Sequence, residues 1–407
     1  MPTSQPSGQV LVQLGYPGDS EASSQAINIL GKVVHDSSVI TSSFNHWTTF
    51  SNFFTTEDPR YVDGVLNALS MAAVPTIFVR VGQPNSAGAT QWGVWQQHIL
   101  QEYRAIYKTS GHVIRVDTSD RLFELARASK TIARTGLVSD IVVAIAKENG
   151  LDTLVEQTKG SWSYIQTQQS DYDFIVNRLI VRAQNEAGQA NYRFFVRDNV
   201  LHFHTVGYQA SIRQIDYLKS PGTELVEVDQ APKLVGQGGS GVRLITHDMY
   251  AGMSNVVAES PEKALRYANR IPKTANVDGG SKFIRYHLGP NGDAEAEAIA
   301  QHYYESQRAG AYQVEISLER AVNLRLNDVI WLTVSSGVAN SPWTGYYNLM
   351  GVTHSIRQGT ISSLLIMQRG ECSGTATVGD DAPGQTLSAS SFTGSKATGM
   401  ANVLNPG

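Results

Sequence analysis

Two histidines have the spacing of a possible metal site. His202 and His204 stand two residues apart in a segment whose pattern predicts a strand, so both point to one face. Two imidazoles placed in this way can hold a metal ion. A third ligand would have to come from elsewhere, and the pattern gives no support to His98, His247 or Asp248. Packed sheet histidines are commoner, so no metal is assigned, and whether the pair binds anything stays open.

Neighbouring carboxylates are the next candidates for chemistry. Asp171 and Asp173 follow Ser170, and Asp380 and Asp381 are adjacent near the C-terminus. Acid–base catalysis by two carboxylates needs them to face each other across a cleft, which adjacency in sequence does not provide. The first pair is explained by the first turn of a helix that Ser170 caps, and the second pair by a solvated tail.

Two further segments match known sequence motifs but lack the context that the motifs need. Gly236–Gly241 fits GxGxxG, but the residues after it, Val242–His247, read as a strand, whereas a dinucleotide site needs a helix there. Ser260–Lys263 fits SxxK without the SDN and KTG motifs of penicillin-binding enzymes, and we expect Ser260 to cap a helix. GxSxG, HExxH and Walker A sequences are absent. We therefore assign no catalytic, cofactor-binding or metal residue and expect no enzyme activity.

Scattered aromatic residues could form a sugar-binding face, although core and interface packing is their commoner use. They include Trp92, Trp95, Trp162, Trp331 and Trp343.

Composition limits the classes of protein further. The 407 residues allow two to four domains. Only 17% are charged, the net charge is −4, and Lys and Arg form no cluster, which argues against dedicated nucleic-acid binding. Cys372 is the single cysteine, so no disulfide forms within the chain. We expect no signal peptide at the N-terminus and no membrane-spanning helix, and we expect the chain to mature in a host cytoplasm.

The first 118 residues mix strands and helices. Segments 10–14, 76–81 and 112–117 read as strands, and Asp58-Pro59 is a typical helix start. Trp92, Trp95, Ile99 and Ile106 predict a second helix by their spacing.

The segment 119–205 predicts a small α/β domain. We expect three helices, capped at Ser119 or Asp120, at Ser139-Asp140 and at Ser170; the second ends at Gly150 and the third at Gly188. A hairpin then joins strands 193–196 and 200–204.

Strands dominate from 206 to 370. The alternation of Tyr312–Glu319 is the cleanest strand pattern in the chain, and strands at 328–334, 345–356 and 360–368 complete an antiparallel run. This pattern is typical of a small β-barrel. An insertion at about 231–310 carries two predicted helices, which begin at Ser260-Pro261 and at Asp293. The remainder, 371–407, is rich in Gly, Ser, Thr and Ala and reads as a flexible tail.

An ordered set of these segments resembles the baseplate hub proteins of contractile phage tails. The set comprises Ser139–Val142, Gly150-Leu151, Gln168–Ile175, Leu201–Phe203, Leu326–Val329, Gly345–Tyr347, Val352–His354 and Thr360–Leu364. The hub part of type VI secretion spike proteins shares this architecture. The resemblance covers about residues 120–370, and the first 120 residues fit only by position.

The resemblance implies a β-rich α+β fold with two tube-like antiparallel β-barrels and an α/β domain between them. The first barrel would come from residues 1–118 and the second from 206–370. Family members form homotrimers, whose six barrels make a ring that joins the sixfold tail tube to the threefold central spike. Partners would be the spike, tail tube proteins and other baseplate proteins, at the distal end of a virion tail, with DNA passing through the lumen.

Two other classes of function remain open at this point. A tail-associated hydrolase or cell-wall-binding protein would need a cleft with a perturbed acid or a metal, and loss of turnover on replacing His202 or Asp173 would support it. A carbohydrate-binding module would use the exposed aromatic residues, and silence on a glycan array would exclude it.

Overall fold

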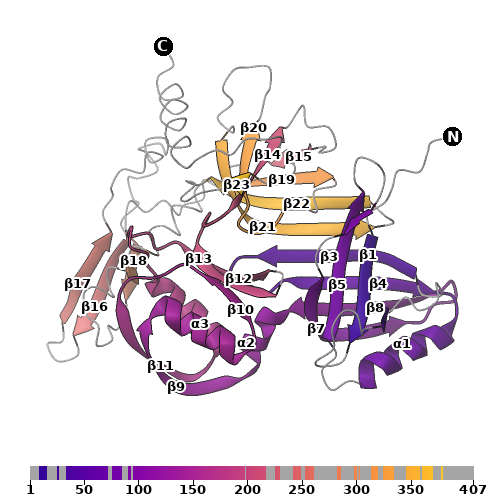
Figure 1. Cartoon of the computed structure of the whole chain (residues 1–407), viewed down its shortest axis with the longest axis horizontal. Helices are drawn as coiled ribbons and strands as arrows, with labels where there is room; N and C mark the ends of the chain where they lie inside the picture. The colour runs from indigo at the N-terminus through magenta and orange to yellow at the C-terminus, as the bar shows by residue number, and fades with distance from the viewer. Residues whose placement is uncertain are drawn as a thin grey trace, which may run out of the picture.

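A computed structural model gives the fold (Figure 1). It describes residues 9–15, 25–26, 34–71, 76–84, 90–92, 95–197, 199–216, 225–229, 242–248, 253–260, 282–285, 298–299, 302, 313–319, 324–333, 345–357, 360–369 and 377–378. The predictions for the loop 236–241, for a helix directly after Pro261 and for most of the 371–407 tail lie outside these residues.

One 15-stranded sheet unites the two ends of the chain. Its main path runs in the order β15-β19-β22-β21-β3-β4-β8-β7-β5-β1-β2, and β6, β14, β20 and β23 pair at its sides. The N-terminal strands are β1 (Gln9–Gly15), β2 (Gln25–Ala26), β3 (Val34–Ser43), β4 (Thr49–Thr56), β5 (Thr76–Pro84), β6 (Thr90–Trp92), β7 (Gln96–Ile106) and β8 (His112–Asp120). The C-terminal strands are β14 (Ser211–Asp216), β15 (Leu225–Asp229), β19 (Gln313–Glu319), β20 (Val329–Thr333), β21 (Gly345–Arg357), β22 (Thr360–Arg369) and β23 (Thr377–Val378).

The predicted antiparallel run at the C-terminus is confirmed. β19 pairs with β22, β22 with β21, and β21 with β20, all antiparallel. The β-rich character of the chain is thus as expected. Within the described strands the path has two ends and does not close on itself, so two separate barrels stay a prediction.

Two hydrophobic clusters lie on the core side of this sheet. The first contains Phe50, Phe54, Val62, Val65, Leu69, Ile77, Val79, Ile114, Val116, Ile356 and Ile361. The second contains Ile215, Ile316, Leu324, Ile330, Leu332, Tyr347, Leu349, Val352, Leu365 and Met367. Helix α1 (Pro59–Met71) begins after Asp58, as predicted, and places Val62, Val65 and Leu69 in the first cluster. Asp58 accepts the backbone N–H of Arg60, which secures this helix start.

A polar pair separates the two clusters. On β21, His354 lies between Val352 of the second cluster and Ile356 of the first, and on β22 Ser363 lies between Leu365 and Ile361. His354 Nδ1 is 2.7 Å from Ser363 Oγ, so both buried polar groups are satisfied.

The central α/β unit occupies the chain between the two halves of the sheet. Its strands β10 (Asp152–Val155), β12 (Tyr192–Arg197) and β13 (Val200–Thr205) form a small mixed sheet. Its helices are α2 (Glu124–Arg127), α3 (Val138–Glu148) and α4 (Asp171–Phe174), and α4 continues through a π turn (Ile175–Leu179) into a 3-10 turn (Ile180–Arg182). A 3-10 turn at Arg121–Phe123 precedes α2. Strands β9 (Ser129–Leu137) and β11 (Ser161–Ser170) pair as a separate ribbon that curves around α3 (Figure 1).

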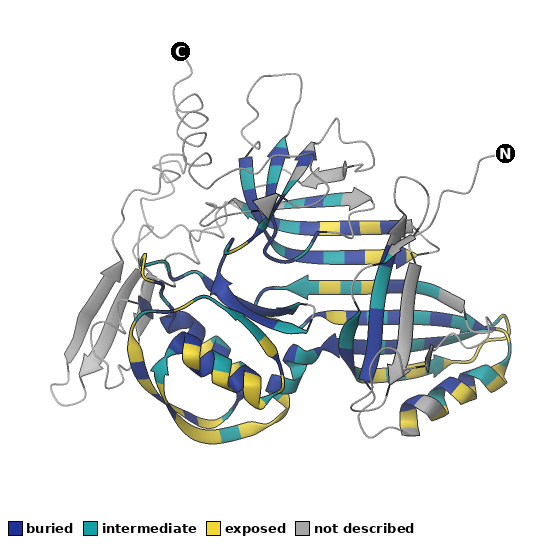
Figure 2. Ribbon diagram, viewed as in Figure 1, coloured by how far each residue is buried: buried dark blue, intermediate teal, exposed yellow. Residues whose placement is uncertain are grey.

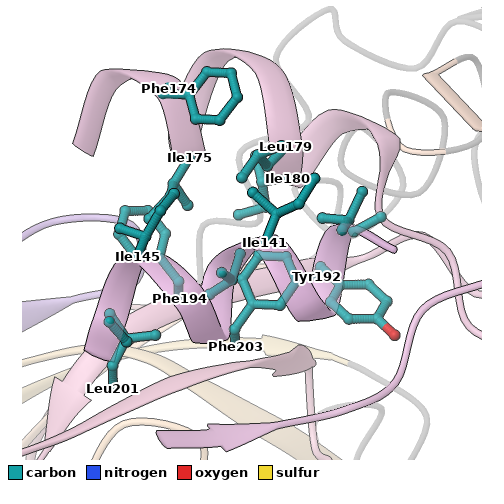
Figure 3. Close-up of a cluster of buried hydrophobic side chains, with 14 of the residues drawn as sticks. Ile141, Ile145, Phe174, Ile175, Leu179, Ile180, Tyr192, Phe194, Leu201 and Phe203 are labelled. Atoms are coloured by element: carbon teal, nitrogen blue, oxygen red, sulfur yellow. The ribbon is translucent and has the colours of Figure 1, made fainter. Parts of the chain in front are cut away.

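This unit has its own core (Figure 3). Ile141 and Ile145 from α3 pack with Phe194 of β12 and Phe203 of β13, and all are almost wholly buried. The predicted inner face of α3 is therefore confirmed. Gly150 ends the helix with φ +66°, a conformation that favours glycine. Buried residues line the facing sides of helix and strands, and exposed ones lie on the outer side of α3 and on the ribbon (Figure 2).

A further small sheet has the order β17-β16-β18, and β16 is the strand predicted after Gly241, whereas β17 and β18 were not predicted. Its strands are β16 (Val242–Asp248), β17 (Met253–Ser260) and β18 (Lys282–Arg285), so the predicted insertion contains strands as well as helix. Ala298, Ile299 and His302 are helical, as the pattern after Asp293 predicts, and Ile299 is buried in the central unit.

Three local predictions are wrong. Residues 96–106 form strand β7 rather than a helix, because pairing with β8 and β5 determines their structure and a bulge between Leu100 and Glu102 interrupts the alternation. The helix after Ser170 ends at Arg182, and Gly188 lies in a later turn closed by Asn185 and Gln189. Ser139 does not cap α3; it exchanges hydrogen bonds with Thr158 instead.

The central core generates a stability prediction. Phe194→Ala should lower the free energy of unfolding by about 3–5 kcal/mol, because it leaves a cavity among fully buried neighbours. Urea denaturation measures the change. Ile165→Ala is the control, since that side chain is 70% exposed and its loss should cost less than about 0.5 kcal/mol. Equal losses in the two variants would contradict this core assignment.

Candidate functional site

The two histidines lie on the face of the small sheet that is turned away from the core of the central unit. His202 and His204 are 5% and 0% exposed on β13, with ring centroids 5.6 Å apart. Phe195 stacks on His202 at 4.6 Å. His204 Nδ1 lies 2.9 Å from the carbonyl oxygen of Thr205, so Nδ1 is the donor and Nε2 carries the lone pair. The spacing therefore places both rings on one face, as predicted.

Burial makes both imidazoles poor bases. Burial is the main cause, and together with the positive charge of Arg197 it lowers the pKa of His202 to about 3 and that of His204 to about 4. Neutral imidazoles are the form that binds metals, but among the residues the structure describes no third histidine, cysteine or carboxylate completes a metal site. His98, the third ligand considered above, is buried against Phe50 on another sheet.

The carboxylates are engaged in structure. Asp171 is 2% exposed in its side chain and binds Lys130 Nζ at 2.6 Å and Gln166 Nε2 at 3.0 Å. Asp173 accepts the hydroxyl of Ser170 at 2.6 Å and donates its backbone N–H to the same hydroxyl at 3.0 Å. The predicted capping by Ser170 is confirmed. Asp380 and Asp381 lie outside the described residues.

The motif residues are not brought together. The strand predicted after Gly241 is β16, which contains His247 and Asp248, and Ser260 is the last residue of β17. Trp162 is buried in the central core, and Trp331 packs against Tyr346 with ring centroids 4.5 Å apart. Trp343 lies outside the described residues.

A polar junction, not anticipated from the sequence, fixes the central unit to the end of β3. Asn45 has φ +61° and bonds Phe194 in both directions: its N–H donates to the Phe194 carbonyl at 2.8 Å, and its Oδ1 accepts the Phe194 N–H at 3.0 Å. The Tyr172 hydroxyl donates to the Asn45 carbonyl at 2.6 Å. The turn after β3 of the large sheet is therefore hydrogen-bonded to β12 of the small sheet.

Asp120 forms a second connection, where β8 ends and the central unit begins. It accepts the backbone N–H of Thr48 at 2.7 Å and that of Leu122 at 3.0 Å. Of the two predicted caps, Ser119 and Asp120, Asp120 caps the 3-10 turn that leads into α2, and its bond to Thr48 adds a connection to the residue before β4. Burial raises the pKa of Asp120 to about 7, although these N–H groups stabilise its charged form.

A third connection joins the segment after β13 to the turn before β20. Asn327, with φ +73°, accepts the N–H of Gly207 at 2.8 Å and donates to the Tyr208 carbonyl at 2.9 Å. Arg197 Nη1 donates to the Leu326 carbonyl at 3.3 Å. Next to these, burial raises the pKa of Asp328 to about 6. Sequence reasoning missed Asn45 and Asn327, since an asparagine in a turn signals only that positive φ is tolerated.

The exposed side of the large sheet is rich in hydroxyl groups. Register alternation places Ser and Thr residues of four adjacent strands on this side with two exposed aliphatic residues, Val39 at 38% and Leu364 at 39%. The Oγ1 atoms of Thr353 and Thr41 are 3.4 Å apart across the β21–β3 ladder. We call this surface the hydroxyl face; it comprises Ser37, Val39, Thr41, Ser51, Thr353, Ser355, Ser362 and Leu364.

Charges border the hydroxyl face and are largely neutralised. Three arginines lie in the same cross-strand row as Ser37 of β3. They are Arg357 of β21, Arg115 of β8 and Arg104 of β7. Arg115 binds Asp117 at 2.7 Å and Arg104 binds Glu102 at 2.6 Å. The surface is thus hydrophilic with little net charge.

None of the helices in the described ranges is long and apolar enough to span a membrane.

Comparison with known proteins identifies the fold. A tail protein of Neisseria meningitidis MC58 superposes with a TM-score of 0.59 at 9% identity, over 89% of this chain and 97% of that one. A 43 kDa tail protein of prophage MuSo2 from Shewanella oneidensis gives 0.57 at 10% identity, over 88% and 98%. A chain of a PdpA–VgrG complex gives 0.50 at 8% identity, over 89% and 65%. No family model and no curated protein sequence matches. The chain therefore has the fold of phage tail proteins, in agreement with the resemblance seen in the sequence.

The junction at Asn45 gives a testable prediction. Asn45→Ala should lower the free energy of unfolding by roughly 2–4 kcal/mol, because the Phe194 N–H loses its acceptor and alanine disfavours positive φ. Asn45→Asp keeps the acceptor and tolerates this conformation, so it should lose less in the same urea titration. Equal losses would show that the Oδ1 acceptor is unimportant.

The buried titratable groups predict acid destabilisation. Burial lowers the pKa of His98, His204, His302 and His354 to about 4 and that of His202 to about 3, so these groups destabilise the fold as pH falls below 6.5. Asp120 and Asp328 have raised pKa values, so their protonation stabilises the fold as the pH falls. Five histidines outweigh two aspartates, so the melting temperature should fall between pH 6.5 and 4.

The histidine contribution can be isolated. His354→Asn should flatten the dependence of the unfolding free energy on pH by up to about 1.4 kcal/mol per pH unit, the value for one proton. The asparagine amide can replace the bond from Nδ1 to Ser363. His46→Gln, at an exposed position, is the control. If His354→Asn left the pH dependence of the unfolding free energy unchanged, His354 would not be a source of the acid destabilisation.

Proposed function

We propose that this chain is a structural subunit of a phage-type tail, and specifically a baseplate hub that forms a homotrimeric ring between a sixfold tail tube and a threefold central spike. The observation that carries this proposal is the likeness of fold to two tail proteins over almost their whole length, 97% and 98%. A shared fold does not determine function, so the proposal also depends on the surfaces of this chain.

The arrangement of the large sheet supports a ring. Each chain contributes two hydrophobic clusters along one sheet, separated by His354 and Ser363. Three chains would then present six such units, which could match a sixfold tube on one side while the trimer keeps threefold symmetry on the other. In this proposal residues 1–118 and 206–370 supply the two tube-like barrels, 119–205 the outer α/β domain, and 371–407 a tail that contacts a neighbour.

The placement of the candidate residues favours a structural role over a hydrolase. A hydrolase needs an accessible acid, base or nucleophile. Asp173 is exposed, but its carboxylate is engaged with the Ser170 hydroxyl at the start of α4, and His202 is buried and stacked against Phe195 with its pKa lowered by burial. The chain therefore acts through contacts, with spike, tube and other baseplate proteins as partners, at the distal end of the tail.

The hydroxyl face supports a passage for DNA without binding. Nucleic-acid binding depends on clustered cations, and the arginines beside this face are mostly paired with carboxylates. A neutral surface of Ser and Thr would allow a polyanion to pass along the ring without retention.

The native mass tests the proposal. Light scattering should give about 130 kDa, three chains of 44.3 kDa each, for the chain alone or after a candidate spike protein is added. The six-unit arrangement requires a closed trimer. A chain that remains monomeric under both conditions would contradict the hub role and redirect attention to a metal analysis of the histidine pair.

A further inference from the structure

The guanidinium of Arg80 contacts the rings of two tryptophans. Its guanidinium carbon lies 4.7 Å from the ring centroid of Trp92 and 4.5 Å from that of Trp95. Each contact is within the range of a cation–π interaction. The arrangement is a Trp92–Arg80–Trp95 stack.

Strand register builds this stack. Trp92 on β6 pairs with Gly82 of β5, and Gln96 at the start of β7 pairs with Val79 of β5. Both tryptophans therefore lie beside the part of β5 that contains Arg80. Because Ile77 and Val79 face the first hydrophobic cluster, alternation turns Arg80 to the opposite side of the sheet. The stack is therefore separate from the core that stabilises this part of the fold.

Among the residues that the structure describes, the Arg80 cation has no anionic partner. Arg104, Arg115, Arg121 and Arg134 each bind a carboxylate, whereas Arg80 has no hydrogen bond or ion pair with any residue in the described ranges. Its Nε atom is fully buried and without a hydrogen-bond partner. The residue as a whole is partly exposed, as are both tryptophans. An Nε–H group buried without an acceptor costs free energy, which an anion bound at the guanidinium would recover.

The geometry restricts what that anion can be. The two indoles contact the guanidinium, and its remaining interaction is through N–H groups in its own plane. A planar carboxylate accepts two parallel N–H bonds in that plane. A nucleic-acid phosphate would require further cations nearby, and the chain has no basic cluster. Tryptophan and arginine are also the residue types that most often anchor protein interfaces.

We propose that the Trp92–Arg80–Trp95 stack is a protein-docking site that receives the carboxylate of an aspartate or glutamate from a partner protein. The two tryptophans exclude water and hold the guanidinium in place, and Arg80 binds the carboxylate through two N–H groups. This inference concerns a contact on one subunit and does not depend on trimer formation.

Fluorine NMR of the full chain, labelled with 5-fluorotryptophan, tests the proposal. The probe is a short capped peptide with one central glutamate, and the matched peptide with glutamine is the neutral control. The glutamate peptide should shift the Trp92 and Trp95 resonances, assigned with Trp92→Phe and Trp95→Phe, and the shifts should grow with peptide concentration. Trp47 and Trp331 should not respond.

Variants of Arg80 separate charge from geometry. Arg80→Gln should abolish the shifts, and Arg80→Lys, which keeps the charge but loses the planar fork, should weaken binding about tenfold. Unchanged Trp47 and Trp331 resonances show that a variant is folded; if Arg80→Gln does not fold, the comparison of Arg80→Lys with the parent chain decides.

Three outcomes would overturn the proposal. They are no response to the glutamate peptide, an equal response to the glutamine peptide, and tighter binding of inorganic phosphate at matched ionic strength, which would indicate an anion site of another class. Light scattering on the same sample distinguishes this test from that of the hub role. If the chain is a trimer but does not bind the peptide, only the docking site is refuted. If the chain is a monomer that binds the peptide, only the hub role is refuted.

Discussion

The structure depends on the pairing of β3 with β21. Seven consecutive residue pairs, from Ser37–Arg357 to Ser43–Gly351, join segments more than 300 residues apart in the chain. Without this ladder the N-terminal and C-terminal strands would form two sheets with two exposed edges. With it, Ile356 and Ile361 of the C-terminal hairpin enter the same cluster as Phe50 and Phe54. Contacts at such separation carry a loop-closure cost, and the central unit, which has a hydrophobic core of its own, lies within the chain between the two strands.

Three polar connections hold the central unit against the large sheet. Asn45 follows β3, Asp120 ends β8, and Asn327 precedes β20, so all lie where the chain leaves or re-enters the large sheet. Each uses a short side chain to satisfy backbone groups that would otherwise be buried without partners. Hydrogen bonds of this kind impose one orientation, whereas a purely apolar contact such as that of Phe44 with Phe195 would tolerate sliding.

The sequence predicted those parts of the fold that are encoded locally. The capping residue Asp120, the inward face of α3 with Ile141 and Ile145, and the alternating strand β19 follow from patterns within a dozen residues. The prediction failed for β7, where a bulge removes the alternation and pairing with β8 determines the structure. The junction, the β3–β21 ladder and the Trp92–Arg80–Trp95 stack could not be predicted, because they depend on register between strands. The histidine pair was placed correctly on one face, but its burial could not be read from spacing alone.

The low identity to the two tail proteins, 9% and 10%, has a physical explanation in this architecture. A sheet fold requires alternation, turn residues and a few junction contacts, and many apolar side chains satisfy the same buried position. The exposed side is less constrained still, since Thr residues of the hydroxyl face contribute β propensity and weak contacts such as that of Thr353 with Thr41. Among the described strands, the main path of the large sheet ends at β15 and β2, and the ribbon β9–β11 pairs with no other strand. Open edges favour association, so an assembled ring would make use of a feature that is a liability in an isolated chain.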